Sequence, residues 1–189
     1  MKLLDLLKES ELEIPDIPNT MNFWHGGDLD NIKDDFRFNK NRIMFGIGLY
    51  LAKKYEVAKK YSKGRRKLYL VTIENGNDIS NSLFDTNACI EFVKNYCITS
   101  KRKEVIHYVN YYSKENKISS YIFNNLILNH HAIKSSNTQN LLNFYINNGI
   151  DYEINDNATY GRIMVLFNLK KIVKITRVKP TDKITVFDL

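Results

Sequence analysis

The stretch MFGIGLYLAKKYEVAKKY, residues 44–61, decides what kind of fold this sequence predicts. Its first half is apolar and glycine-containing, and Gly48–Ala52 is expected to form a short strand. Its second half spaces apolar residues helically among lysines, which predicts a helix from about Lys53 to Ser62 that Gly64 ends. A strand that runs directly into a helix is typical of a mixed α and β chain.

Strand candidates lie on both sides of this stretch and again near the end of the chain. Each is a short run rich in β-branched or aromatic residues. They are Met21–His25, Leu68–Glu74, Ile163–Phe167, Ile172–Arg177 and Ile184–Phe187. Residues 1–9 instead place leucines on one helical face, and we expect a packing helix there.

A long middle segment, residues 86–148, follows a different pattern. Its apolar residues recur at helical spacing, which predicts three or four helices, the last ended by Gly149. The chain has 189 residues, which is enough for one domain of ordinary size. We therefore expect a single α+β domain over residues 1–189, with mostly antiparallel strands at both ends and a helical insert at about residues 86–148.

The composition excludes several classes of protein. With 43% hydrophobic residues, 26% charged residues and only 3 prolines, the chain is expected to fold rather than to be disordered. No apolar run approaches the roughly 20 residues that span a bilayer. The N-terminus lacks a cleavable signal pattern, so we expect a cytoplasmic protein with no membrane partner. Cys89 and Cys97 match no metal-ligand spacing and are expected to be free thiols in the core.

The net charge of +7 is unevenly distributed along the chain. Residues 1–35 are acidic, whereas residues 53–67 hold eight basic residues and one acid. A second basic segment, residues 162–183, holds seven basic residues and one acid. Lysine-rich faces commonly serve only solubility. Two such segments brought together by the fold would suit a phosphate-bearing ligand or partner.

Two segments carry residue types that can hold a flat polar ligand. Residues 23–27, FWHGG, place the imidazole of His25 at a strand end beside backbone without a Cβ, while Trp24 faces the core. In the second segment, Tyr50 ends a strand and Tyr61 lies on the following helix, so the two rings could sandwich an aromatic ring. A structural interpretation also stays open, in which His25 bonds a backbone carbonyl and both tyrosines are core aromatics.

Taken together, these residues resemble the ADP-ribosyltransferases of the diphtheria-toxin and poly(ADP-ribose) polymerase type. The resemblance rests on His25-Gly26 in a strand, then Phe45-Gly46-x-Gly48-x-Tyr50-x-Ala52, then Tyr61, and a strand pair near the C-terminal end. It covers roughly residues 21–74 and 160–178, so the helical middle lies outside it. It implies a split pair of small β-sheets of ADP-ribosyltransferase type, with a cleft that binds NAD+ in a bent conformation and requires no metal.

The resemblance also implies a role for each matched residue. His25 would hydrogen-bond the 2′-hydroxyl of the adenosine-side ribose, and the Gly26 backbone would anchor the nicotinamide carboxamide. Tyr50 and Tyr61 would lie on the two faces of the nicotinamide ring, and Gly48 would complete the NAD+-binding segment. The reaction would pass through an oxocarbenium-like state whose positive charge the site must tolerate.

One element of the family, a glutamate that opens a late strand, is not evident. The candidate strand, residues 161–168, has no acid, and the family position falls on Arg162 or Ile163. Arg162 would suit the pyrophosphate, and Glu153 or Asp156, expected in the preceding loop, could supply a carboxylate. Members of the family without this glutamate usually transfer a single ADP-ribose.

The sequence therefore predicts a mono-ADP-ribosyltransferase that moves ADP-ribose from NAD+ to a macromolecular acceptor and releases nicotinamide. Its catalytic candidates are His25, Tyr50, Arg162 and Glu153. A protein side chain is favoured over nucleic acid as the acceptor, and the helical insert is expected to select it. By analogy, the protein is a toxin or phage effector. Two alternatives stay open: an inactive domain that binds NAD+ or a partner, and a basic nucleic-acid-binding protein.

Overall fold

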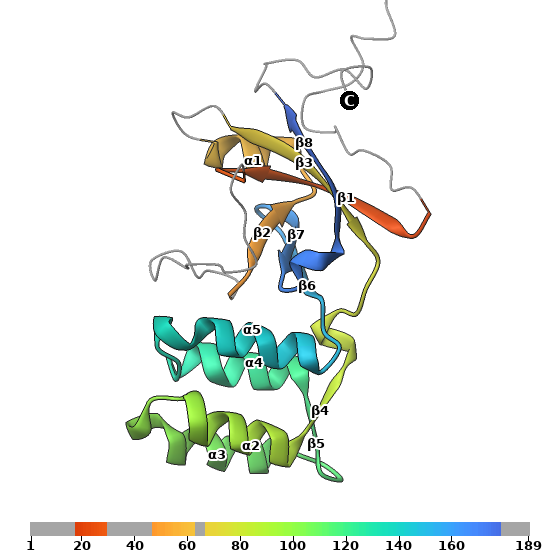
Figure 1. The fold of residues 1–189 in the computed structure, drawn as a ribbon. Helices are drawn as coiled ribbons and strands as arrows, with labels where there is room; N and C mark the ends of the chain where they lie inside the picture. The colour runs from red at the N-terminus through yellow and green to blue at the C-terminus, as the bar shows by residue number, and fades with distance from the viewer. Residues whose placement is uncertain (1–17, 30–46, 63–66, 179–189) are drawn as a thin grey trace, which may run out of the picture. The chain divides into compact units, whose positions relative to one another are not determined.

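The computed structural model describes residues 18–29, 47–62 and 67–178, and its elements are labelled in Figure 1. The strands are β1 (Thr20–Gly26), β2 (Leu49–Ala52), β3 (Leu68–Glu74), β4 (Leu83–Asp85), β5 (Lys117–Ser119), β6 (Tyr152–Asn157), β7 (Gly161–Leu166) and β8 (Ile172–Val178). The α-helices are α1 (Tyr55–Tyr61), α2 (Thr86–Tyr96), α3 (Thr99–Tyr112), α4 (Ser120–Asn129) and α5 (Thr138–Asn147). The expected helix at 1–9 and strand at 184–187 lie outside the described residues. None of the described helices is long and apolar enough to cross a membrane.

Six strands form one sheet in the order β6-β7-β2-β1-β3-β8. β1 and β3 pair antiparallel along their whole length, and the β3–β8 and β2–β7 pairs are also antiparallel. β1 and β2, in contrast, share the single pair Trp24↔Ala52. The mostly antiparallel α+β architecture is thus confirmed. The structure does not have two separate small sheets. It has two three-stranded halves, β6-β7-β2 and β1-β3-β8, which are joined by the backbone pair Trp24↔Ala52.

Helix α1 packs on one face of this sheet. The ring of Tyr55, at its start, meets Trp24 edge to face, with 5.2 Å between the ring centroids. Trp24 is fully buried, as expected. The helix begins two residues later than predicted because Lys53 continues the β2–β7 pairing, donating its backbone N–H to the Arg162 carbonyl at 2.9 Å. Because strand residues alternate, Phe23 and His25 point to the opposite face of the sheet.

The chain divides into two compact units, each with its own core. The first contains the described residues of 1–34, 49–75 and 154–189, and the second contains those of 35–48 and 76–153. The expected insert at 86–148 therefore lies wholly within the second unit.

The second unit is built from four α-helices and the two-stranded sheet β4-β5. Helix α3 packs against both α2 and α4, and α4 and α5 are joined by the hydrogen bond between Asn124 and Tyr145; Figure 1 shows these helices beside the short β-ribbon. Phe84, on β4, is buried against α4 and α5, where it meets Phe123 and stacks on Tyr145 with 6.0 Å between ring centroids. Cys89 and Cys97 are free and buried, as expected, and burial raises their pKa values to about 12 and about 11.

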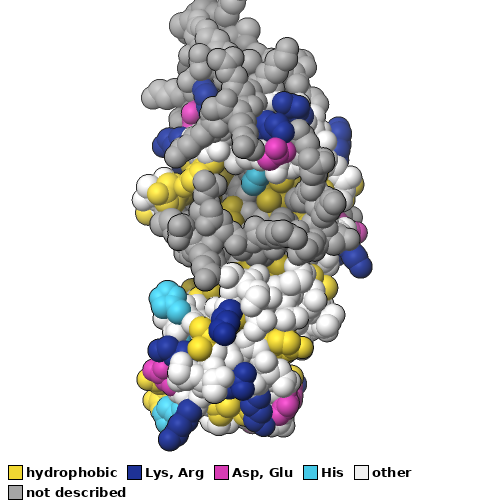
Figure 2. Space-filling model, turned by 60° about the vertical axis from the view of Figure 1, so that its left-hand side comes forward, with side chains coloured by type: hydrophobic (Ala, Val, Ile, Leu, Met, Phe, Trp, Pro, Cys, Tyr) yellow, Lys and Arg dark blue, Asp and Glu magenta, His cyan; other side chains and the backbone are white. Residues whose placement is uncertain are grey.

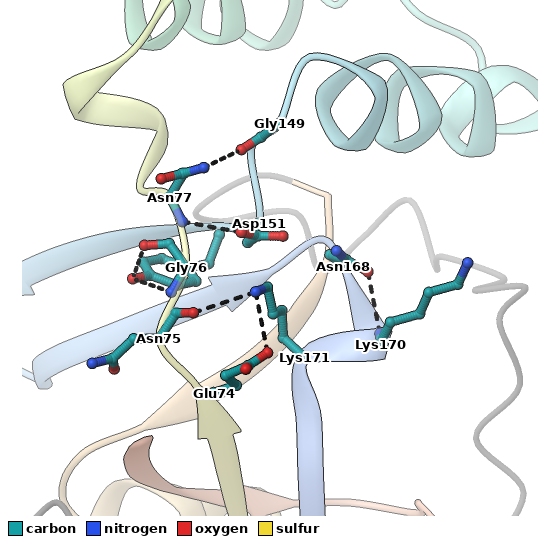
Figure 3. Close-up of polar contacts among 10 residues, drawn as sticks. Glu74, Asn75, Gly76, Asn77, Gly149, Asp151, Asn168, Lys170 and Lys171 are labelled. Atoms are coloured by element: carbon teal, nitrogen blue, oxygen red, sulfur yellow. Dashed lines mark hydrogen bonds and ion pairs between the residues drawn. The ribbon is translucent and has the colours of Figure 1, made fainter. Parts of the chain in front are cut away.

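Between Asn75 and Gly76 the chain passes from the first unit to the second, and polar contacts hold it on both sides of this crossing (Figure 3). In the first unit, Lys171 Nζ lies 3.2 Å from Glu74 Oε2 and donates to the Asn75 carbonyl at 3.3 Å. In the second unit, the backbone N–H of Asn77 donates to the Asp151 carboxylate at 3.0 Å. The crossing segment is therefore fixed within each unit by that unit's own side chains.

A buried polar network joins α4, α5 and β6 in the second unit. Asn124 Nδ2 donates to Glu153 Oε2 at 3.0 Å, and the Tyr145 hydroxyl donates to Asn124 Oδ1 at 2.8 Å. All three residues are buried. The Asn124 amide thus satisfies a buried carboxylate oxygen and a buried hydroxyl at once.

We expect Asn124→Ala to lower the free energy of unfolding of the second unit by about 3 kcal/mol, because two buried polar groups lose this partner. Urea unfolding followed by far-ultraviolet circular dichroism measures it, since the second unit holds four of the five described α-helices. The matched control is Asn143→Ala on the exposed side of α5, which should change the value by less than about 0.5 kcal/mol. Equal effects of the two substitutions would contradict the role of the network.

Candidate functional site

The end of β1 brings His25 beside Tyr50, a residue on the neighbouring strand. His25 Nδ1 lies 2.8 Å from the Tyr50 carbonyl oxygen. Because a carbonyl can only accept, Nδ1 carries the proton and donates this bond. Among the described strand residues, β1 and β2 make no further backbone pair beyond Trp24↔Ala52. The His25 side chain therefore bridges the two halves of the sheet where backbone pairing stops.

The other ring nitrogen of His25, Nε2, is left as a hydrogen-bond acceptor. Burial lowers the pKa of His25 below 6.5, and the bond to the Tyr50 carbonyl opposes this shift more weakly. The ring is thus neutral at pH 7. A Cβ at Gly27 would lie 2.7 Å from Nε2, so a glycine is needed where the chain passes this nitrogen. The expected structural contact, a bond to a backbone carbonyl, is present, and it orients the ring for a second contact.

Gly26 is required by the close approach of α1. A Cβ at this position would lie 1.9 Å from the Ala58 carbonyl oxygen and 2.8 Å from the Ser62 backbone nitrogen. No rotamer relieves this clash, because both atoms belong to the backbone. The absence of a side chain at position 26 therefore has a structural cause, and it also leaves the strand backbone bare beside His25.

The two tyrosines of the predicted site differ in their exposure. Tyr50 is half-buried on β2. Tyr61 is the last residue of α1, next to Ser62, and its side chain is 57% exposed, which excludes its interpretation as a core aromatic. Gly48 is buried directly before β2 and belongs to the second unit. His25 contacts the Tyr50 backbone, and the neighbouring Gly26 lies against the end of α1 that carries Tyr61.

The structure separates the two residues considered for the missing glutamate. Arg162 is exposed, whereas Ile163 is buried and pairs with Ala52. Arg162 forms a two-point contact with the exposed Asp156, Nε to Oδ1 at 3.0 Å and a terminal nitrogen to Oδ2 at 3.2 Å. This arginine lowers the pKa of Asp156, chiefly by hydrogen bonding. Asp156 lies on β6 and not in a loop as predicted, and β7 has no acid.

The prediction that Glu153 lies in a loop is wrong. Glu153 lies on β6, is buried, and accepts the hydrogen bond from Asn124 in the second unit. Its carboxylate takes part in a buried hydrogen bond inside the second unit. The sequence did not indicate this role, because the partner amide lies on a helix 29 residues earlier. Glu153 belongs to the second unit, whereas His25 belongs to the first.

The two basic segments meet in the first unit. The Lys54 side chain passes over Gly161, where a Cβ would lie 2.9 Å from Lys54 Cε. Lys53 Nζ lies over the Phe23 ring, 5.5 Å from its centroid, on the face that also carries His25. Among the described residues, Figure 2 shows Lys and Arg scattered over the visible face rather than gathered in one block.

Sequence reasoning missed two residues beside His25. Tyr69 on β3 pairs directly with His25, and Arg177 on β8 pairs directly with Tyr69. Paired residues project to the same face of a sheet, so an imidazole, a phenol and a guanidinium follow one another across three strands. Alternation along one strand shows which of its residues share a face. Only the pairing register between strands shows that these three side chains are neighbours.

The described residues contain no group of three or more His, Cys, Asp or Glu side chains placed to hold a metal ion. Comparison of the chain with protein-family models, curated proteins and solved structures finds no match. The candidate site is therefore defined by its residues and their geometry.

Proposed function

We propose that the protein is a mono-ADP-ribosyltransferase that uses NAD+ as its substrate. The observation that carries the proposal is the hydrogen bond from His25 Nδ1 to the Tyr50 carbonyl. This bond orients the ring and places its proton on Nδ1, and burial keeps the imidazole neutral, so Nε2 can accept a hydrogen bond from a ribose hydroxyl.

The surroundings of His25 support an extended ligand that bends around the end of β1. On the His25 face, Lys53 and Arg177 supply positive charge that suits a pyrophosphate. On the α1 face, the Gly26 backbone and the exposed ring of Tyr61 suit a flat carboxamide-bearing ring. The adenosine side of NAD+ would lie at His25 and the nicotinamide at Gly26.

In the proposed reaction, the bond between the nicotinamide nitrogen and the ribose C1′ breaks, and its electron pair leaves with neutral nicotinamide. A nucleophile of the macromolecular acceptor, with a protein side chain favoured, forms the new bond to C1′ and loses its proton to solvent or a nearby base. His25, Gly26 and Tyr61 would hold the ring and ribose for this displacement. By analogy, the acceptor is met in the cytoplasm of the producing or a host cell.

One observation favours a second candidate function, an NAD+-binding domain without chemistry. Where the family places a glutamate, this chain has the exposed Arg162, already engaged by Asp156, and then the buried Ile163. Neither side chain can polarise an acceptor as a carboxylate does. Binding of NAD+ without release of nicotinamide would identify this function.

The test is to measure NAD+ binding by calorimetry and nicotinamide release with and without a cell lysate. We expect binding by the protein alone and release that requires the lysate. Tyr61→Ala should weaken binding up to roughly tenfold, because it removes one aromatic face from the ring. Tyr61→Phe, which keeps that face, should bind as the unaltered protein does. Absence of NAD+ binding would overturn the proposal.

A further inference from the structure

A strip of aromatic side chains runs along α3 and onto the residue that follows α4 in the second unit. Its members are His107, Tyr108, Tyr111, Tyr112 and His130. The Tyr108 and Tyr112 rings are stacked with 6.3 Å between centroids, and Tyr111 meets Tyr112 edge to face at 5.0 Å. His107 and His130 lie 5.4 and 5.3 Å from Tyr108. The five rings therefore form one continuous surface.

Val105 and Val109, both fully buried, make the core contact of α3. Tyr108 and Tyr112 lie beside them at helical spacing, whereas His107 and Tyr111 point away from that face. The Tyr111 side chain is 72% exposed and that of Tyr112 is 44% exposed. Large apolar rings exposed side by side, rather than singly, mark an interaction surface.

The strip is bordered by positive charge. Residues 99–134, which include α3 and α4, hold six basic residues and two acids. Of the two acids, Glu104 already contacts Lys101 Nζ at 3.7 Å and His130 Nδ1 at 3.3 Å. Within the described part of the chain, Lys103 and Lys114 have no carboxylate within ion-pair distance. In the lower, helical part of Figure 2, Lys, Arg and His side chains, with some Asp and Glu, lie among hydrophobic ones.

We propose that this aromatic strip binds single-stranded nucleic acid. Exposed rings on which bases stack, bordered by lysines that meet the phosphates, are the combination that binds unpaired strands without reading their sequence. An apolar protein partner would not use the surrounding cations, and a duplex would hide its base faces from the rings. The proposal goes beyond the transferase function and does not depend on it, because the strip belongs to the second unit.

The test is fluorescence anisotropy with a labelled single-stranded oligonucleotide of mixed sequence, as DNA and as RNA, on the full chain without NAD+. We expect binding that weakens with salt. Tyr111→Ala should weaken it roughly fivefold to a hundredfold, and Tyr111→Trp should retain it. The control is Tyr121→Ala, which removes a 42% exposed tyrosine of α4 outside the strip and should leave binding unchanged. Circular dichroism verifies that each variant is folded.

Three results would overturn the proposal. The first is no binding of either oligonucleotide, including the case in which an acidic peptide binds instead. The second is binding that Tyr111→Ala leaves unchanged while neutralising Lys59 and Lys60 abolishes it, which would place the strand on the first unit. The third is a preference for the duplex. Because NAD+ is absent, none of these results bears on the proposed transferase.

Discussion

Gly26→Ala is expected to lower the free energy of unfolding of the first unit by about 3 kcal/mol, at the upper end of the range for overpacking. The added Cβ would lie 1.9 Å from the Ala58 carbonyl oxygen, so α1 must move away from β1. That movement also breaks the contact between Trp24 and Tyr55. NAD+ binding should be lost with it, because Tyr61 moves with the helix.

The chain's single tryptophan, Trp24, provides the measurement. It is buried on β1, so the urea transition of its fluorescence reports on the first unit. Gly149→Ala is the control: it adds a methyl group 4.0 Å from Asn77 Nδ2, without a clash, at a φ of +77° in the second unit, which costs about 1 kcal/mol there. It should leave the Trp24 transition in place. A Gly26→Ala protein with an unchanged Trp24 transition would show that α1 does not pack as described.

Nicotinamide release is expected to fall roughly a hundredfold in His25→Ala, as for other losses of positioning in an active site. The substitution removes the Nε2 acceptor for the ribose hydroxyl and also the bond that holds the Tyr50 backbone. In His25→Gln one amide can both donate to the Tyr50 carbonyl and accept from a hydroxyl, so part of the activity should remain. Steady-state rates, with Trp24 fluorescence as the test of folding, measure both variants.

The low pKa of His25 gives this prediction a pH signature. Because burial lowers the pKa below 6.5, activity should persist as the pH falls through 6.5 and decline only at lower pH, where Nε2 becomes protonated. The stability of the folded chain also decreases as the pH falls below 6.5. Below pH 6.5 the unfolded chain binds a proton that the folded chain does not, so the free energy of unfolding decreases as the pH falls. His25→Gln should reduce this dependence. A full loss of activity between pH 7 and 6.5 would contradict a neutral His25.

Local patterns predicted β1, β2, β3, β7 and β8 and the helical segments, but not β4, β5 and β6. Leu68–Glu74 forms β3 with the predicted bounds, and the helical spacing of residues 86–148 corresponds to four helices. Both outcomes follow from side-chain periodicity, which each segment carries by itself. The burial of Trp24 follows from the same alternation. The start of α1 was misplaced because Lys53 pairs with a strand more than a hundred residues away.

The site, in contrast, depended on strand register. The pair Trp24↔Ala52 sets Tyr50 within reach of the His25 ring, and a shift of one residue would turn every side chain of β2 to the other face. Register likewise exposes Arg162 and buries Ile163, and it places Tyr69 and Arg177 in a row with His25.

The sequence by itself determined the kinds of residue available: a histidine beside glycines at a strand end, a tyrosine at the end of the next helix, and an aromatic segment rich in lysine. The tertiary structure decided which of them meet. It buried Glu153 against Asn124 and left Tyr61 and Tyr111 exposed. The physical reason is that periodicity is a property of neighbours in the chain, whereas register, burial and hydrogen-bond partners are set by residues far apart in it.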